Sequence, residues 1–283
     1  MTMEEVQPPQ GQSEDSEHKV RRSSFYTALR ILPARQREAM FEIYGFCRDV
    51  DDIADDGGPR DERQTELALW RSEIDAVYLG SVSPRTRGIA RSVQRFGLKR
   101  EDFQAIIDGM AMDVTADIRG PDMAILDLYC DRVASAVGRL SVRVFGMEET
   151  SGIALSHHLG RALQLTNILR DIDEDAEIGR LYLPNEALHT AGISTREPIE
   201  AVAHPAIATA CAPVVEKAKG HFAEARSIMA RSPRKTIRTP KLMCEAYGSI
   251  LDGLIRRGFA APRERVRISK LKRLGLLLLY GIF

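Results

Sequence analysis

From residue 24 onward, apolar residues recur at the spacing of an α-helix, and no sustained alternation of apolar and polar residues indicates a strand. Short turn signals such as GSVSP and RGPD separate these segments. The pattern predicts an all-α fold without internal repeats or a domain linker. The predicted helices cover residues 39–56, 60–79, 83–96, 101–117, 122–145, 152–176, 197–230, 240–258 and 264–280.

The first of these helices has two distinct faces and ends at the turn Gly57-Gly58-Pro59. Its apolar face consists of Ala39, Ile43, Phe46, Cys47, Val50 and Ala54. Its polar face collects Tyr44, Arg48, Asp51, Asp52 and Asp55. The acidic end of this helix is a solvated terminus or one wall of a ligand site.

The helix predicted over 152–176 is apolar nearly all round, which indicates burial. One polar stripe interrupts it, formed by Gln164, Asn167, Asp171 and Asp175. Buried polar groups cost free energy unless they are satisfied, and a ligand-lined cavity is one way to satisfy them.

Both acidic segments carry carboxylates four residues apart, as in Asp51/Asp55 and Asp171/Asp175. On a helix such like charges lie about 5–6 Å apart and destabilise it by about 0.2–0.5 kcal/mol per pair. A cation between them removes this repulsion. Hard oxygen ligands suit Mg²⁺, which proteins usually bind through one or two carboxylates together with substrate phosphates. The two clusters therefore suggest a magnesium-dependent diphosphate site.

Composition narrows the class of protein further. The 283 residues contain 40 basic and 40 acidic side chains, and this balance argues against a nucleic-acid-binding protein. The four cysteines are widely spaced, so neither a disulfide framework nor a zinc site is expected and a reducing, cytoplasmic location is favoured. No signal peptide is recognisable. The polar start MTMEEVQPPQGQSEDSEH predicts a disordered tail over residues 1–20, followed by a single domain over 21–283.

The C-terminal segment RVRISKLKRLGLLLLYGIF joins a basic run to about ten apolar residues, well below the roughly 20 that span a bilayer. One interpretation is a last helix packed on the core. The other is a peripheral attachment to the inner membrane surface, with Lys and Arg facing anionic headgroups.

Four segments together resemble a known family: SSFYTALRILP, YGFCRDVDDIADD, YCDRVASAVGRLSVRVFG and LGRALQLTNILRDIDEDAEIGRLYLP. They resemble the squalene/phytoene synthase family of head-to-head prenyl diphosphate synthases, and the resemblance runs from about Ser23 to the end. LPNEAL, AYGSILDGLIRRGF and RVRISK are most similar to bacterial members of hopanoid and squalene biosynthesis. Phytoene synthases and dehydrosqualene synthases remain alternatives.

The resemblance implies an isoprenoid-synthase-type helical bundle around a central cavity. It also implies that two farnesyl diphosphates are joined into presqualene diphosphate, a C30 diphosphate, with release of diphosphate. Since the chain has no G-x-G-x-x-G turn for a dinucleotide, separate downstream enzymes are expected to complete the conversion to squalene. A terpene cyclase acting on one substrate and a non-catalytic helical assembly module are the other hypotheses.

The resemblance also implies roles for individual residues. Asp51, Asp52, Asp55, Asn167, Asp171 and Asp175 are the expected metal ligands. Arg48 and Arg170 are expected to grip diphosphate, and the rings of Tyr44 and Tyr129 to stabilise a carbocation. The remaining expected substrate contacts are Ser23, Ser24, Phe25, Gln164, Tyr247, Arg265 and Lys270, with Arg267 beside the last two.

Several other polar residues are assigned no site role. Asp173, Glu174 and Glu177 are interpreted as surface charges. Asp108 and Asp113 are interpreted as cavity-lining residues without a metal. His157 and His158 are adjacent on a predicted helix, so they are expected to face different directions and not to form a metal pair.

Overall fold

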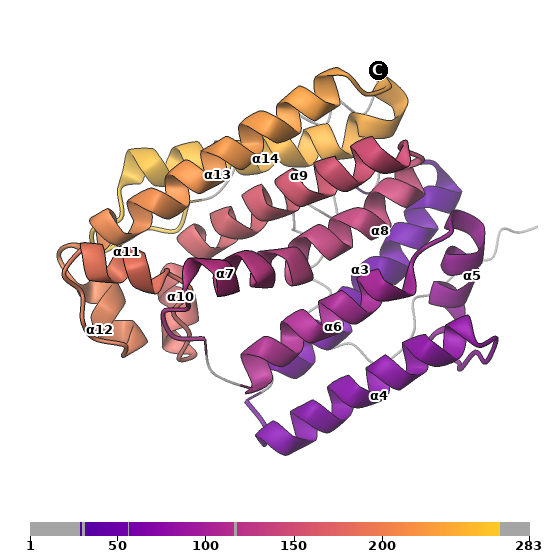
Figure 1. Ribbon diagram of the computed structural model, residues 1–283, viewed down its shortest axis with the longest axis horizontal. Coiled ribbons are helices and arrows are strands. Elements are labelled where there is room, and N and C mark those ends of the chain that lie inside the picture. Colours follow the sequence, from indigo (N-terminus) through magenta and orange to yellow (C-terminus); the bar gives the residue numbers. More distant parts are fainter. Residues whose placement is uncertain (1–28, 30–31, 56, 116–117, 267–283) are drawn as a thin grey trace, which may run out of the picture.

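The structure, a computed structural model, describes residue 29 and residues 32–55, 57–115 and 118–266. The all-α prediction is confirmed (Figure 1). The described residues contain no strand, and the one isolated β-bridge joins Arg119 to Leu181. The predicted tail over 1–20 lies outside the described residues, as does most of the C-terminal basic and apolar segment.

Twelve α-helices and one π-helical turn make up the described fold. They are α3 (Ala34–Asp55), α4 (Arg60–Tyr78), α5 (Arg87–Phe96), α6 (Arg100–Thr115), α7 (Met123–Cys130), η1 (Asp131–Ser135), α8 (Ala136–Phe145), α9 (Glu149–Arg170), α10 (Ile172–Glu177), α11 (Asn185–Thr190), α12 (Pro198–Ala203), α13 (Ile207–Ala230) and α14 (Arg234–Arg257).

The helices are arranged around the continuous stretch α7–η1–α8, which runs through the middle of the molecule (Figure 1). On one side α8 packs on α9, and α9 packs in turn on α13 and α14. On the other side α6 packs on η1 and α8, and α4 packs on α6. Each side has its own cluster of buried apolar residues, and Val133 of η1 contacts both clusters.

Local sequence signals explain where several helices begin and end. The Asp122 side chain accepts a 2.7 Å hydrogen bond from the Ile125 amide and caps α7. Glu148 caps α9 by accepting bonds from the amides of Thr150 and Ser151. Gly97 ends α5 with a φ of 62°, which favours glycine because it has no Cβ.

The helix predicted over 152–176 is interrupted, and this affects the polar stripe. Asp171 has φ −101° and ψ 20°, so α9 ends before it and α10 begins after it. The Asp171 amide still donates to the Asn167 carbonyl and the Asp175 amide to the Asp171 carbonyl, both at 2.8 Å. Helical spacing is therefore kept across the bend.

Other boundaries differ from the predictions for identifiable reasons. The predicted helix 197–230 divides at His204, whose extended backbone separates α12 from α13. Helix α14 begins at Arg234 and not at Pro240, because buried Thr236 and Ile237 extend its packed face. The short α11 is absent from the prediction. Of the helix predicted over 264–280, only residues 264–266 are described, and they are not helical.

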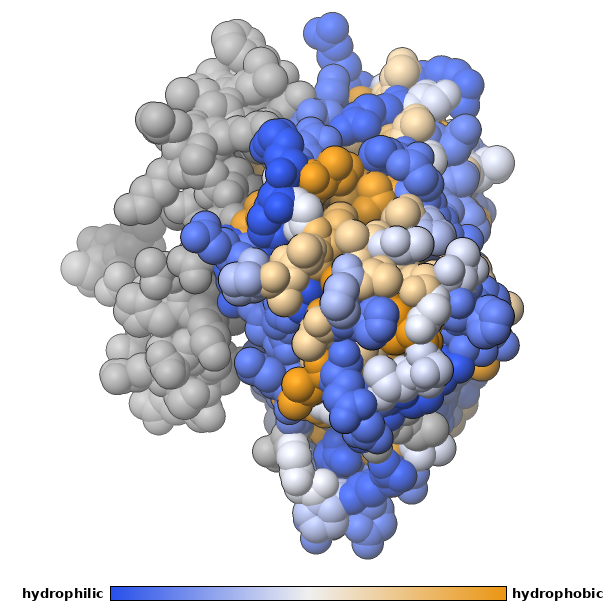
Figure 2. Space-filling view, turned by 90° about the vertical axis from the view of Figure 1, so that its left-hand side faces the viewer, coloured by the Kyte–Doolittle hydropathy of each residue, from blue (hydrophilic) through white to orange (hydrophobic). Residues whose placement is uncertain are grey.

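Figure 2 views the molecule from the left-hand side of Figure 1, where the labels of α10, α11 and α12 gather, and hydrophilic residues there surround smaller apolar areas. Within the described ranges, none of the helices has the length and apolar character needed to cross a membrane.

Candidate active site

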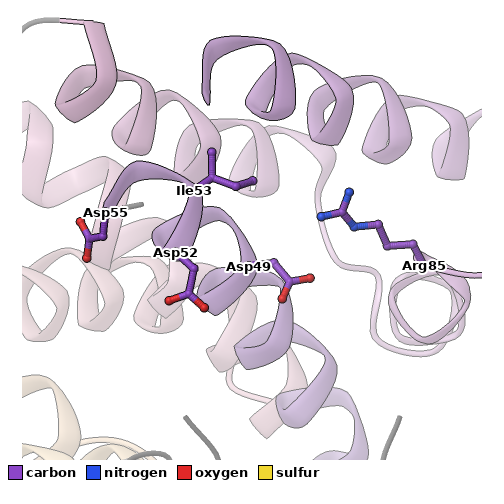
Figure 3. Close-up of a pocket in the computed structure, with 5 residues that line it drawn as sticks. All are labelled: Asp49, Asp52, Ile53, Asp55 and Arg85. Atoms are coloured by element: carbon purple, nitrogen blue, oxygen red, sulfur yellow. The ribbon is translucent and has the colours of Figure 1, made fainter. Parts of the chain in front are cut away.

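The last turns of α3 present the first acidic motif. Arg48, one turn earlier, donates a 2.8 Å hydrogen bond from Nη2 to Asp52 Oδ1, and its Nη1 lies 3.5 Å from Asp51 Oδ2. Asp49, Asp52 and Asp55 extend from successive turns beside an open depression of about 580 Å³, and Arg85 approaches from the segment before α5 (Figure 3). This end of α3 therefore offers both carboxylate and guanidinium groups to a ligand.

The second acidic motif lies at the bend between α9 and α10. The Arg170 guanidinium donates to both oxygens of Asp171, with Nε to Oδ1 at 2.8 Å. One turn earlier, the Asn167 amide nitrogen lies 3.4 Å from Gln164 Oε1. Asn167 Oδ1 is buried and has no hydrogen-bond partner. An unsatisfied buried oxygen costs free energy, so a ligand at this position would stabilise the stripe.

Arg180 joins the two motifs, which are more than 100 residues apart in the sequence. Its Nη1 donates a 2.6 Å hydrogen bond to Asp55 Oδ1, and its Nη2 donates a 2.9 Å bond to the Ala54 carbonyl. Arg180 also lines a small space together with Asp175. The ends of α3 and α10 therefore face one another across a single guanidinium.

The raised pKa values of two aspartates also indicate that the acidic motifs lie close together. Burial raises the pKa of Asp175 to about 7, with further upward contributions from Asp171, Asp113 and Asp55 and a downward one from Arg180. Burial likewise raises the pKa of Asp51 to about 6, and Asp55 adds to this shift. Carboxylates from both motifs therefore repel one another in one poorly solvated space.

A buried network that the sequence analysis missed adjoins this space. Tyr129 donates a 2.9 Å hydrogen bond to Asp113 Oδ2, and Tyr182 donates a 2.8 Å bond to Asp113 Oδ1. The two rings stack with centroids 5.0 Å apart. Burial raises the pKa of Asp113, although Arg180 and both hydroxyls lower it. Tyr182 and Arg180 belong to the matched segment IGRLYLP, but their spacing gave no sign of this contact.

The remaining predicted residues fall into two groups. Tyr44 is half-buried beside Arg48 and Asp51, and Tyr247 interacts with Arg170. Arg265 Nη2 lies 3.5 Å from Asp171 Oδ1. The residues that lie outside the described part of the chain are Ser23, Ser24, Phe25, Arg267 and Lys270.

Two acidic residues without a predicted metal role, Asp108 and Asp173, are held in ion pairs. Asp108 accepts a 2.5 Å hydrogen bond from Arg71 of α4, whereas Asp113 accepts its hydrogen bonds from Tyr129 and Tyr182. Asp173 pairs with Arg263, whose Nε lies 2.8 Å from Asp173 Oδ2. Asp113 of α6 therefore interacts with the acidic motifs, whereas Asp108 of the same helix pairs with α4.

An apolar cavity of about 90 Å³ lies beside the polar site. Its lining comes from η1, α8, α9 and α14, namely Ala134, Val137, Gly138, Ser141, Val142, Phe145, Leu155, Ser156, Leu159, Gly160, Leu163, Thr239, Pro240 and Met243. The cavity lining ends at Leu163 along α9, and the polar stripe begins at Gln164. Along α9, an apolar surface is therefore followed directly by side chains that carry oxygen and nitrogen groups.

The fold and this site define an all-helical protein of the isoprenoid-synthase type, with an apolar cavity next to two converging acidic motifs. Residues 19–272 match the squalene/phytoene synthase family, and the chain belongs to that family.

Curated relatives are similar over nearly their whole length. The presqualene diphosphate synthase of Rhodopseudomonas palustris is 61% identical over 92% of this chain and 93% of its own. The enzyme of the same name from Zymomonas mobilis is 49% identical over 98% of this chain and 97% of its own. A phytoene synthase of Mycobacterium tuberculosis is 36% identical over 61% of this chain and 57% of its own.

Two solved structures share the fold. A dehydrosqualene synthase in complex with ligand has a TM-score of 0.80 at 24% identity and covers 94% of this chain and 93% of its own. A squalene synthase from Alicyclobacillus acidocaldarius has a TM-score of 0.76 at 27% identity, and the match covers 87% of this chain and 94% of its own. The predicted isoprenoid-synthase-type fold is thereby confirmed.

Proposed function

We propose that the protein joins two farnesyl diphosphates head to head into presqualene diphosphate and releases one diphosphate. The observation that carries this proposal is the identity of 49–61% to presqualene diphosphate synthases over more than nine-tenths of the chain. The facing acidic motifs and the adjoining apolar cavity supply the parts that such a reaction needs. It is a prenyltransferase reaction within isoprenoid biosynthesis.

The acidic residues fit a hard divalent cation. Partly buried carboxylates with raised pKa values and the unpaired Asn167 Oδ1 form a set of oxygen donors. Mg²⁺ would be held by Asp51, Asp55, Asn167, Asp171 and Asp175, with Asp52 at the more exposed rim. When bound, the cation supplies Lewis-acid stabilisation of the departing diphosphate.

Guanidinium groups surround the same space and would bind diphosphate oxygens. Arg48 contacts the first motif, whereas Arg170 and Arg265 contact the second. Arginine offers paired donors in a fixed geometry, so it orients a diphosphate as well as neutralising it. In the described structure these groups are held by carboxylates, which keep them oriented before substrate arrives.

The apolar cavity and the aromatic residues explain how a reactive cation would be protected. Carbon chains lying along α8 and α9 exclude water, so the second substrate's double bond captures the cation. The faces of Tyr129 and Tyr44 can stabilise positive charge without forming a bond. Met243, which is unbranched and flexible, lines this cavity and can adapt its shape to a bound chain.

Product analysis tests the proposal. Purified protein, farnesyl diphosphate and Mg²⁺, without a reductant, are expected to yield a C30 diphosphate detected by mass spectrometry. Chelation of Mg²⁺ should abolish the product, and Asp51→Asn should reduce kcat/KM by about 10²-fold or more. Glu177→Gln, an exposed carboxylate of α10, serves as the matched control and should leave the rate unchanged.

Other outcomes would replace the proposal. A C40 product from geranylgeranyl diphosphate would indicate a phytoene synthase, and a cyclised C15 product would indicate a terpene cyclase. Unchanged cellular function after Asp51→Asn would favour a helical assembly module. We further propose that separate enzymes reduce the product to squalene, which predicts that added NADPH does not change the product of this protein alone.

A further inference from the structure

Three histidines that the active site does not use lie together between α9 and α13, which pack side by side. His157 and His158 belong to α9, and His221 belongs to α13. One ring nitrogen from each can be chosen so that all three atoms lie within 4.8 Å of one another. The expectation that His157 and His158 face different directions is wrong, because their rings lie edge to face with centroids 4.8 Å apart.

The spacing between the two helices already approaches that of a metal site. His158 Nδ1 and His221 Nδ1 lie 3.0 Å apart. Two imidazole nitrogens on one tetrahedral Zn²⁺, each about 2.0–2.1 Å from the metal, lie about 3.3 Å apart. A small change in the side-chain torsions is enough to place a cation between these two rings.

The environment keeps two of these rings, those of His221 and His157, in the form that binds metals. Burial lowers the pKa of His221 to about 4, and His158 and Lys217 lower it further. Burial and Arg161 lower the pKa of His157. Neutral imidazole is the ligand form, so a metal would have no proton to displace from His157 or His221 near pH 7.

The charges around the cluster leave room for a cation. Arg161 and Lys217 are cationic neighbours, but each is paired with Asp127, and Arg161 is also paired with Asp131. The nearby charges therefore largely cancel. His157 is exposed and the other two rings are half-buried, so a metal can enter from solvent and keep a water ligand.

We propose that His157, His158 and His221 form a second metal site, one for a borderline divalent cation such as Zn²⁺ that joins α9 to α13. Imidazole donors favour Zn²⁺, Co²⁺, Ni²⁺ or Cu²⁺, whereas the carboxylates of the active site favour Mg²⁺. His158 precedes Asp171 by about 20 Å along the helix axis at about 1.5 Å per residue. The two sites are thus separate in position and in chemistry.

Binding would stabilise the junction of the two helices, since a ligand that binds only the folded state raises its stability. The test uses the untagged full chain, stripped by a chelator and kept in excess Mg²⁺ to occupy the carboxylates. Zn²⁺ is then titrated in competition with a chromophoric chelator, and the thermal midpoint is followed in parallel. One high-affinity Zn²⁺ per chain and a higher midpoint are expected.

Variants identify the ligands. His158→Ala and His221→Ala are each expected to weaken Zn²⁺ binding by about tenfold or more, since even loss of an outer partner costs about 10–100-fold. His189→Ala removes an exposed histidine elsewhere and should bind as the parent does. Circular dichroism and Mg²⁺-dependent product formation establish that each variant is folded.

Cobalt provides a second readout that depends on ligand type. Co²⁺ in this site should give the intense visible absorption of a four-coordinate ion with three imidazole ligands and one water, and His221→Ala should remove it. Parent-like Zn²⁺ affinity in both His158→Ala and His221→Ala would overturn the proposal. Loss of the Zn²⁺ equivalent in Asp175→Asn, with the histidine variants unaffected, would also overturn it.

Discussion

The carboxyl group of Asp175 shows how strongly single residues in this site depend on their surroundings. In an unfolded chain an aspartate titrates near pH 3.9. In the folded protein burial and the neighbouring carboxylates raise its pKa to about 7. Between these two values the folded state binds a proton that the unfolded state does not, so Asp175 favours folding at low pH and loses that contribution as the pH rises through about 7.

The first prediction follows from this loss of stability with rising pH. In a chelating buffer, the free energy of unfolding should fall between about pH 4 and about pH 7, and Asp175→Asn should flatten the decline. Urea denaturation at several pH values measures both. Saturating Mg²⁺ should restore the parent at the higher pH by mass action. An equal slope in parent and variant would show that Asp175 does not carry the effect.

The Tyr182 hydroxyl supports a second prediction. Tyr182→Phe leaves Asp113 Oδ1 without its tyrosine donor and should cost about 1–3 kcal/mol of unfolding free energy. Because Asp113 adjoins the acidic motifs, kcat/KM should also fall about tenfold or more.

Tyr78→Phe provides the comparison for that prediction, because Tyr78 donates a 2.8 Å hydrogen bond to the Leu98 carbonyl away from the site. It should lower stability and leave the rate unchanged. Equal rates in the two variants would exclude a positioning role for Tyr182.

At the scale of elements, the close approach of α8–η1 to α9 depends on small residues. A Cβ on Gly160 would lie 2.7 Å from the backbone of Ser135, which cannot move aside as a flexible side chain can. Gly138 faces Ser156 in the same contact. These residues bring together the two helices that line most of the apolar cavity.

A third prediction compares two glycines within helices. Gly160→Ala should lower the free energy of unfolding by about 1–3 kcal/mol through overpacking. Gly220→Ala, at an exposed position of α13 with nothing within 4 Å of the added Cβ, should raise it by about 0.4–1 kcal/mol. Chemical denaturation measures both, and a stabilised Gly160→Ala would contradict this view of the contact.

The long helices could be predicted from the sequence more accurately than the bends and short segments that connect them. Long periodic segments such as α4 and α6 are amphipathic over many residues, so the sequence predicts them to within two residues at either end. The bend at Asp171, the π turn and the short α11 depend on contacts with other helices, which local patterns do not contain. The acidic stripe was predictable because it is periodic, whereas Arg180 and Tyr182 became recognisable only once the ends of α3 and α10 lay side by side.

At the scale of the whole molecule, Arg180 links the side of the bundle containing α3 to the side containing α10. Its side chain is 12% exposed, and it bonds both the Asp55 carboxylate and the Ala54 carbonyl. Both bonds go to the last turn of α3, so they tie the segment that follows α10 to that end of the helix.

The fourth prediction concerns this link. Arg180→Gln should lower the free energy of unfolding by about 1–3 kcal/mol, because it removes charged hydrogen bonds at a partly buried position. Mg²⁺ affinity should change as well, since the guanidinium offsets repulsion among the carboxylates. Arg119→Gln, whose Nη1 lies 3.3 Å from Glu197, is the comparison and should leave Mg²⁺ affinity unchanged. Parent-like affinity in Arg180→Gln would remove Arg180 from the site.

The π turn η1 has a consequence for how this chain can vary. The Ala136 amide bonds to the Asp131 carbonyl, which adds one residue to an otherwise α-helical run. Each residue of an α-helix rotates the chain by about 100°, so this extra residue sets the angular phase between Tyr129 before it and Gly138 after it. A shortening by one residue would rotate one of them out of place, whereas substitution keeps the phase. The segment should therefore tolerate changes of side chain far better than changes of length.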